Sequence, residues 1–174
     1  MELFSVLKIA EKWYERKKIS HELTLIYEPH VHPFLRCNIW HLRGRDKDLI
    51  IDTGLCVASL RAEIADLIDK PVSALATHIH YDHVGCLHEF DDRLMHKIEA
   101  PRMPNYDEFC WLKLTDFPDD YQSALRVGDF HDYLIDAVPE KGFNIDGYQV
   151  TPTTVTHTLE EGDVIDLGNL SLEV

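Results

Sequence analysis

The sequence predicts an α/β protein, with a layered α+β arrangement in which helices cover one sheet. Two adjoining strand-like stretches, an amphipathic helical pattern and a further short apolar strand follow one another along the chain. Elements in this order usually build one sheet with helices packed against it. With 174 residues the chain can bury a substantial core, so we expect residues 1–174 to form a single domain.

The N-terminal segment has apolar residues at helical spacing. We expect an amphipathic helix there whose apolar face consists of Leu3, Val6, Leu7, Ala10, Trp13 and Tyr14. The basic run at residues 16–18 then reads as the solvated end of that helix. From His21 to about His32 the alternation of Leu23, Leu25 and Tyr27 predicts a strand.

Residues 37–54 predict a β-hairpin with a polar turn at residues 43–47. Its second strand is a continuous apolar run that leads straight into Asp52-Thr53-Gly54, which suggests a buried strand whose end delivers a carboxylate into a turn. From the residues alone, a turn or capping role for Asp52 is favoured over a role in a site.

A second amphipathic helix is expected next, marked by Val57, Leu60, Ile64, Leu67 and Ile68. Pro71 ends it, because proline disfavours continuation of a helix. A short strand at residues 72–76 follows and leads directly into a group of histidines. Polar groups that gather where the strands of a sheet end are a usual place for a site.

The stretch Thr77-His78-Ile79-His80-Tyr81-Asp82-His83-Val84-Gly85 predicts a metal-binding turn. In extended backbone His78 and His80 lie on the same side and can hold one ion. A turn into a helix starting near Val84 would point Asp82 and His83 at a neighbouring position for a second ion. Imidazole and carboxylate together suit zinc best, with iron or manganese as alternatives. The opposing interpretation is a chance cluster in a histidine-rich chain.

Composition excludes several partners. The net charge of −14, from 31 acidic and 17 basic residues, argues against binding to nucleic acid or an anionic membrane. Neither a secretory signal nor an apolar stretch long enough for a membrane span is evident, so we expect a soluble cytoplasmic protein. The four cysteines, Cys37, Cys56, Cys86 and Cys110, are widely spaced without a CxxC pair, which favours reduced thiols, most of them in the core.

The histidine turn, read together with Ile51-Asp52-Thr53-Gly54 some 25 residues earlier, resembles the HxHxDH signature and early motif of the metallo-β-lactamase superfamily. The stretch at residues 38–40, the turn at 159–163 and an expected hairpin at 164–174 are also similar, so the resemblance covers about residues 20–174. It is greatest to a hydrolase branch outside the true β-lactamases. The implied fold is an αββα sandwich, of which this chain looks like the N-terminal portion, truncated at its C-terminus.

The resemblance implies a role for each site residue. His78 and His80 would bind the first metal, and Asp82 and His83 the second, in a site with two zinc ions. Asp52 becomes a residue that orients the site, which reverses the preference for a turn role. The implied reaction is attack of a metal-bound hydroxide, positioned by Asp82, on an ester, thioester, amide or phosphoester of a small-molecule substrate. Asp82 and Asp52 are therefore the expected catalytic residues.

The family completes both metal positions with ligands that would follow Val174: a third histidine, a bridging aspartate and a last histidine. A homo-oligomer or a complementing C-terminal segment would have to supply them, and His157 is a weak candidate for a stand-in. Two rivals to the hydrolase remain: an iron-dependent oxidoreductase on the same fold, and a catalytically silent half-domain that acts through association. For the aromatic segment at about 101–148, core packing or a dimer contact is favoured over a substrate lid.

Overall fold

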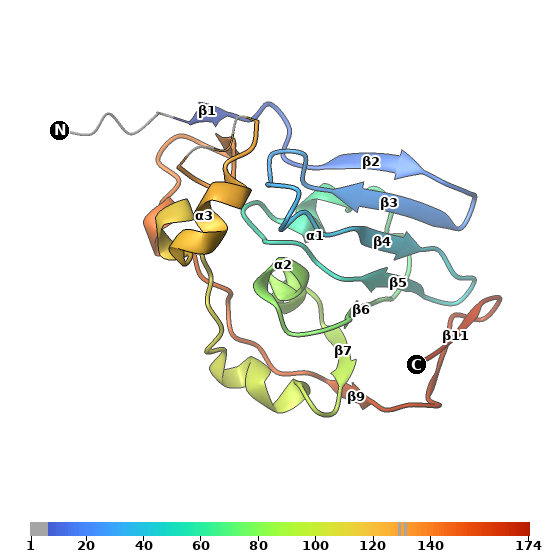
Figure 1. The fold of residues 1–174 in the computed structure, drawn as a ribbon. Helices are drawn as coiled ribbons and strands as arrows, with labels where there is room; N and C mark the ends of the chain where they lie inside the picture. Colours follow the sequence, from blue (N-terminus) through green and yellow to red (C-terminus); the bar gives the residue numbers. More distant parts are fainter. Residues whose placement is uncertain (1–6, 129, 131) are drawn as a thin grey trace.

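The computed structural model describes residues 7–128, 130 and 132–174. Its centre is a seven-stranded sheet, in which the first four strands pair antiparallel and the last four run parallel (Figure 1). The strands, in their order across the sheet, are β2 (Glu15–Lys18), β3 (Leu23–Tyr27), β4 (Ile39–Leu42), β5 (Asp48–Ile51), β6 (Val72–Ala76), β7 (Asp92–His96) and β9 (His157–Leu159).

Short helices connect these strands. They are α1 (Leu60–Glu63), α2 (Tyr81–Val84), α3 (Asp119–Leu125) and the 3-10 turns η1 (Leu87–Glu89), η2 (Ala100–Asn105), η3 (Leu114–Asp116) and η4 (Ile145–Gly147). Two small sheets complete the described part of the chain. One is the parallel pair β1 (Lys8–Ile9) and β8 (Ala137–Val138), and the other is the antiparallel hairpin β10 (Val164–Asp166) and β11 (Ser171–Glu173).

The main sheet is covered on both faces, which explains the continuous apolar run of β5. Successive side chains of a strand point to opposite faces, and both Leu49 and Ile50 are fully buried. Ile50 belongs to the large core, which also contains Leu60 of α1 and Val84 of α2. Leu49 belongs to a smaller core that includes Ile165 from the terminal hairpin. The layered α/β class predicted from the sequence is therefore confirmed.

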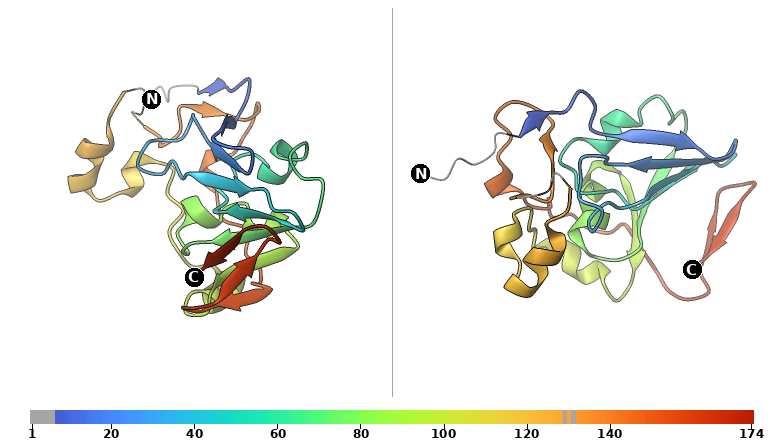
Figure 2. Two further views of the ribbon diagram at one scale, coloured as in Figure 1. Left: turned by 90° about the vertical axis from the view of Figure 1, so that its right-hand side faces the viewer. Right: turned by 45° about the horizontal axis from the view of Figure 1, so that its top comes forward.

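Two segments extend from opposite sides of the sheet. The segment that contains α3 lies on one side, to the left in Figure 1, whereas the β10–β11 hairpin lies on the other, to the right (Figures 1 and 2). The hairpin is attached to the β4–β5 turn, where the Asp46 amide donates to the carbonyl of Leu167 at 3.1 Å. In the described part of the chain, no helix has the length and apolar character needed to cross a bilayer.

Several predicted elements are confirmed: the strand at β3, the hairpin of β4 and β5, the strand β6 with its predicted bounds, and the terminal hairpin. The prediction of an N-terminal helix is wrong for the described residues, and Leu3 and Val6 lie outside them. Instead Glu15–Lys18 forms β2 and pairs with β3, while Trp13 and Tyr14 are buried in the large core. Pairing with a neighbouring strand here overrides the helical spacing of the apolar residues.

Two predicted helices have different bounds. The helix expected over residues 57–68 is only α1, capped by Ser59, whose hydroxyl accepts from the Ala62 amide at 3.1 Å. The helix expected near Val84 begins at Tyr81 instead, because the backbone of His80 is extended and the next residues turn at once. Asp82 and His83 therefore lie within α2 rather than ahead of it.

The expectation of four reduced thiols is wrong for one pair, because Cys56 and Cys86 form a disulfide. They are 30 residues apart in sequence, and no local pattern marks them as partners. The fold brings them together because the loop after β5 packs on the end of α2, where the Gly85 amide donates to the carbonyl of Gly54 at 2.9 Å. Cys37, buried as expected, and the half-buried Cys110 are free thiols.

Candidate metal centre

The site begins where two neighbouring parallel strands end. Asp52 follows β5 and Thr77 follows β6, so both lie at the same edge of the sheet. The Asp52 amide donates to the carbonyl of Leu75 at 2.7 Å. One carboxylate oxygen of Asp52, Oδ1, accepts from the Thr77 amide at 2.8 Å and from its hydroxyl at 2.9 Å. The carboxylate is thereby fixed between the two strand ends.

The four residues predicted as metal ligands come together at this edge. The ring of His78 lies 4.6 Å from that of His80 and 4.0 Å from that of His83, measured between centroids. Since α2 begins at Tyr81, its first turn carries Asp82 and His83. The Nε2 atom of His83 lies 3.4 Å from Oδ2 of Asp82. Three imidazoles and one carboxylate are thus gathered by a strand end and a single helical turn.

Asp52 contacts His83 on the other side of its ring. Oδ2 of Asp52 lies 2.8 Å from Nδ1 of His83. With a proton on Nδ1 donated to this carboxylate, Nε2 lies on the side of Asp82. Asp52 also has a left-handed backbone, with a φ of 61°. Asp52 therefore lies in a turn, as favoured from the residues alone, and it also contacts His83.

Electrostatics favour positive charge at His83. Burial lowers the pKa of its imidazole, but hydrogen bonds with Asp52, Asp82 and Cys37 outweigh burial and raise that pKa to about 12. His83 without a metal is therefore protonated at neutral pH, and an ion bound at Nε2 would have to replace the proton that faces Asp82. The pKa of His78 shifts the other way: burial and the nearby His83 and His80 lower it. A neutral imidazole, the form that binds metal, is thus favoured at His78.

Cys37 is a neighbour of the site that the sequence did not mark. Its buried Sγ lies 3.7 Å from Nδ1 of His83, and burial raises the pKa of the thiol. The ligand atoms of Cys37, Asp52 and His83 all lie within 4.8 Å of one another. Cys37 precedes an ordinary apolar strand, β4, and no spaced cysteine or histidine near it signals a site, so sequence reasoning placed it only in the core.

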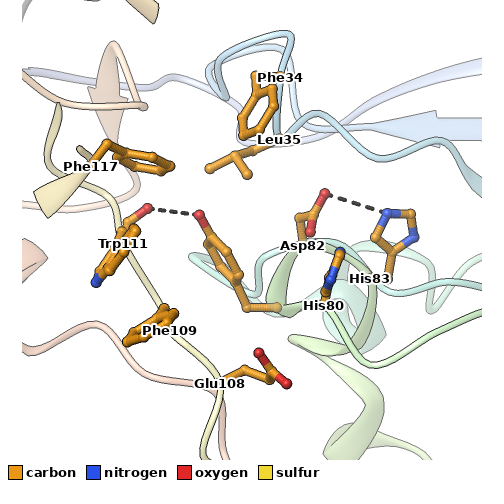
Figure 3. Close-up of a pocket in the computed structure, with 10 residues that line it drawn as sticks. Phe34, Leu35, His80, Asp82, His83, Glu108, Phe109, Trp111 and Phe117 are labelled. Atoms are coloured by element: carbon orange, nitrogen blue, oxygen red, sulfur yellow. Dashed lines mark hydrogen bonds and ion pairs between the residues drawn. The ribbon is translucent and has the colours of Figure 1, made fainter. Parts of the chain in front are cut away.

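A cavity of about 520 Å³ opens beside the histidine turn. Its polar lining comes from His80, Asp82, His83 and Glu108, and the rest is apolar or aromatic. Figure 3 shows Phe109, Trp111 and Phe117 on one side of the space and Asp82, His80 and His83 on the other. The remaining lining residues are Phe34, Leu35, Tyr81, Phe109, Trp111 and Phe117.

Two tyrosines attach the aromatic segment to the histidine turn. The Tyr81 hydroxyl donates to the carbonyl of Trp111 at 2.9 Å, and the Tyr106 hydroxyl donates to that of Ile79 at 3.0 Å. Phe109 stacks on Trp111 at a centroid distance of 4.5 Å and is 66% exposed. Part of the segment at 101–148 therefore lines the cavity, a placement that the preference for core packing or a dimer contact did not anticipate.

Three further histidines, His157, His30 and His32, have partners outside the histidine turn. His157, the weak candidate for a third ligand, is exposed on β9 and its Nδ1 lies 2.9 Å from Oδ1 of Asp92. Nδ1 of His30 lies 2.8 Å from Oδ1 of Asp136, and Nδ1 of His32 accepts from the Phe34 amide at 3.0 Å. The structure thus provides no support for His157 in the histidine cluster. His131 lies outside the described residues.

Comparisons with known proteins agree with this fold. The model of the metallo-beta-lactamase superfamily matches residues 32–174. The human and chicken proteins named acyl-coenzyme A thioesterase MBLAC2 are both 31% identical to this chain, over 180 and 177 residues. These alignments cover 95% of this chain but only 58% and 57% of the relatives, so the chain spans a little over half of their length.

Solved structures show the same fold at low sequence identity. The crystal structure of the class B3 di-zinc metallo-beta-lactamase LRA-12, from an Alaskan soil metagenome, aligns with a TM-score of 0.58 at 18% identity. The alignment covers 95% of this chain and 52% of the LRA-12 chain. BJP-1, a subclass B3 metallo-beta-lactamase of Bradyrhizobium japonicum, aligns with a TM-score of 0.56 at 15% identity, over 94% of this chain and 53% of its own. Given the family match and these relatives, the chain belongs to the metallo-beta-lactamase superfamily.

Proposed function

We propose that the complete protein is a metal-dependent hydrolase with two zinc ions, acting on a thioester that carries an apolar acyl group. One observation carries the proposal: the cavity of about 520 Å³ has the side chains of the histidine turn on one side and aromatic side chains on the other. The volume is in the range of small-molecule sites. The name of the MBLAC2 relatives, acyl-coenzyme A thioesterase, is consistent with this substrate class.

The donor set fits zinc. Histidine nitrogen and carboxylate oxygen are common zinc ligands, and an orienting carboxylate behind a ligating histidine is the usual arrangement. We assign His78 and His80 to one ion, and Asp82 and His83 to the other. The hydrogen bond between Asp52 and Nδ1 of His83 supports this assignment, because it places Nε2 on the side of Asp82.

Bound zinc would supply an acidified water as nucleophile and would polarise the thioester carbonyl. Residues of this chain do the rest. Asp82, which lines the cavity, orients the attacking water and accepts a hydrogen bond from it. Asp52 holds His83 in place. Phe109, Trp111 and Phe117 bind the acyl chain and exclude bulk water from the carbonyl.

The test uses the full-length protein, purified and analysed for metal, with acyl thioesters from acetyl to palmitoyl as substrates. We expect about two zinc ions per chain and a kcat/KM that rises with acyl length. His80→Ala should abolish turnover while the fold is retained. His21→Ala, which changes an exposed histidine outside the cavity, is the matched control and should behave like the parent.

Each rival function gives a different result in the same experiment. Stoichiometric iron without thioester hydrolysis would indicate the oxidoreductase, and loosely held, substoichiometric metal would indicate the silent association partner. Undiminished turnover by His80→Ala would show that the histidine turn is not the catalytic centre. A kcat/KM independent of acyl length would remove the role proposed for the aromatic side of the cavity.

A further inference from the structure

Glu28, directly after β3, has a buried carboxylate that the proposed reaction does not use. Glu28 is only 1% exposed. One carboxylate oxygen, Oε1, accepts from the indole Nε1 of Trp13 at 2.8 Å, and the other, Oε2, accepts from the amide of Leu55 at 2.9 Å. Burying an ionisable group costs free energy that a neutral residue would avoid. This cost suggests a role that requires a carboxylate at this position.

The hydrogen bond from Leu55 is half of a clamp. Leu55 is fully buried, and its carbonyl accepts a hydrogen bond from the hydroxyl of Tyr148 at 2.6 Å. Two polar side chains from distant segments therefore hold both its N–H and its C=O. At the preceding residue, Gly54, an added Cβ would lie 2.6 Å from Oε2 of Glu28. Glu28 thus fills the space that a side chain at residue 54 would occupy.

The clamped loop, residues 52–55, packs against α2 and the residue after it. The Gly85 amide donates to the carbonyl of Gly54 at 2.9 Å, and a Cβ at residue 85 would overlap the Leu55 carbonyl. The amide and the hydroxyl of Thr53 donate to the carbonyl of His83 at 2.8 Å and 3.0 Å. A shift of this loop would therefore move both Asp52 and the helical turn that carries His83.

We propose that Glu28 is a positioning residue for the metal centre: by fixing the Leu55 amide it sets the loop 52–55, and through that loop the relative placement of Asp52 and His83. The inference rests on the proposed metal-binding function of His83. Burial raises the pKa of Glu28 to about 7 against the effect of its two hydrogen bonds, and the charge of Asp82 adds to the rise. Glu28 is therefore also within electrostatic reach of the centre.

Three variants separate the Leu55 contact from general packing. Glu28→Met keeps the length of the side chain but removes both acceptors. Glu28→Gln keeps one acceptor for the Leu55 amide. Trp13→Phe removes the indole donor and leaves the Glu28 contact with Leu55 in place. The readouts are zinc affinity, from competition with a chromogenic chelator, and the His83 imidazole resonances of the metal-free protein by nitrogen-15 NMR.

We expect the more weakly held zinc ion to bind roughly 10-fold less tightly in Glu28→Met, the lower end of the effect seen when support of a ligand is lost. The His83 resonances should shift in this variant. Glu28→Gln and Trp13→Phe should stay within about threefold of the parent. Parental zinc affinity in folded Glu28→Met overturns the proposal, and so does an equal loss in Trp13→Phe, which would indicate packing alone.

If Glu28→Met does not fold, Tyr148→Phe takes its place, because it removes the bond on the other side of Leu55. A loss of affinity of roughly 10-fold then supports the clamp, and affinity within about threefold of the parent overturns it. The NMR readout keeps this test separate from the proposed function. A parent that binds no zinc contradicts the metal centre, whereas the His83 resonances of the metal-free variants still decide whether Glu28 positions that residue.

Discussion

The carboxylate of Asp52 and the imidazole of His83 lie 2.8 Å apart, although 31 residues separate them in sequence. Asp52 comes from the end of β5 and His83 from the first turn of α2, so the contact joins the two motifs on which the family resemblance rests. An acceptor from the first motif thus faces Nδ1 of a histidine in the second.

Asp52→Asn tests this contact. An asparagine amide can donate to Nδ1 of His83, which would move the imidazole proton to Nε2 and block the position proposed for zinc. We expect the second zinc ion to bind about 10-fold to 100-fold less tightly, measured by chelator competition. Asp91→Asn, at an exposed carboxylate, is the matched control. If Asp52→Asn holds both ions with parental affinity, Asp52 does not orient His83.

Phe109→Ala tests the aromatic side of the cavity. Phe109 is 66% exposed, so its removal should change the fold little. It should cost the apolar contact with a long acyl chain, about 1 kcal/mol or a fivefold lower kcat/KM for palmitoyl thioester. Acetyl thioester, which is too short to reach the ring, should react as with the parent. Tyr121→Ala, another exposed aromatic side chain, is the control, and an equal loss for both substrates would contradict acyl binding at Phe109.

The sequence predicted most of the sheet and all four residues of the histidine cluster. The strands β3 to β6 have strong local patterns, and the spacing of His78, His80, Asp82 and His83 is itself the motif. The N-terminal region was wrong because helical spacing of Trp13 and Tyr14 does not reveal that Glu15–Lys18 finds a strand partner in β3. Pairing of this kind depends on tertiary structure, which a short window of sequence does not contain.

The supporting contacts of the site could not be predicted for a related reason. Cys37, Glu28 and Tyr148 meet the centre or its loop only because the chain folds back between segments far apart in sequence. None of them belongs to a spaced motif. The four residues of the histidine turn form a local pattern that a short window of sequence contains, whereas supporting residues need only one contact each and can come from anywhere in the chain.

The disulfide between Cys56 and Cys86 gives a further prediction, because it links the loop after β5 to the end of α2. Closing a loop with a sequence separation of 30 should stabilise the fold by about 3.6 kcal/mol. We expect Cys56→Ser to lower the free energy of unfolding by that amount, measured with urea. Dithiothreitol should destabilise the parent equally and leave the variant unchanged. A parent that is insensitive to the reductant would show that the bond does not contribute to stability.

The buried carboxyl of Glu28 should make stability depend on pH. Its pKa is about 7 in the folded protein against 4.5 as the ordinary value, so between these values the folded state holds a proton that the unfolded state has released. Its contribution is therefore fully present below pH 4.5 and is lost as the pH rises through 7, in total about 3 kcal/mol. Tyr14 and Tyr148 face the same region, but burial raises their pKa further above 10, so they stay neutral across this range.

Glu28→Gln isolates this effect, because its neutral amide does not titrate. Unfolding in urea, with chelator present to exclude metal, should show the parent losing stability relative to Glu28→Gln as the pH rises from 4.5 to 8. The exposed Glu161→Gln variant should show no such difference from the parent. A difference between parent and Glu28→Gln that stays constant with pH would mean that Glu28 has the same pKa folded and unfolded. The carboxylate would then be ionised over most of this range, and the Leu55 amide would donate to a full negative charge at neutral pH.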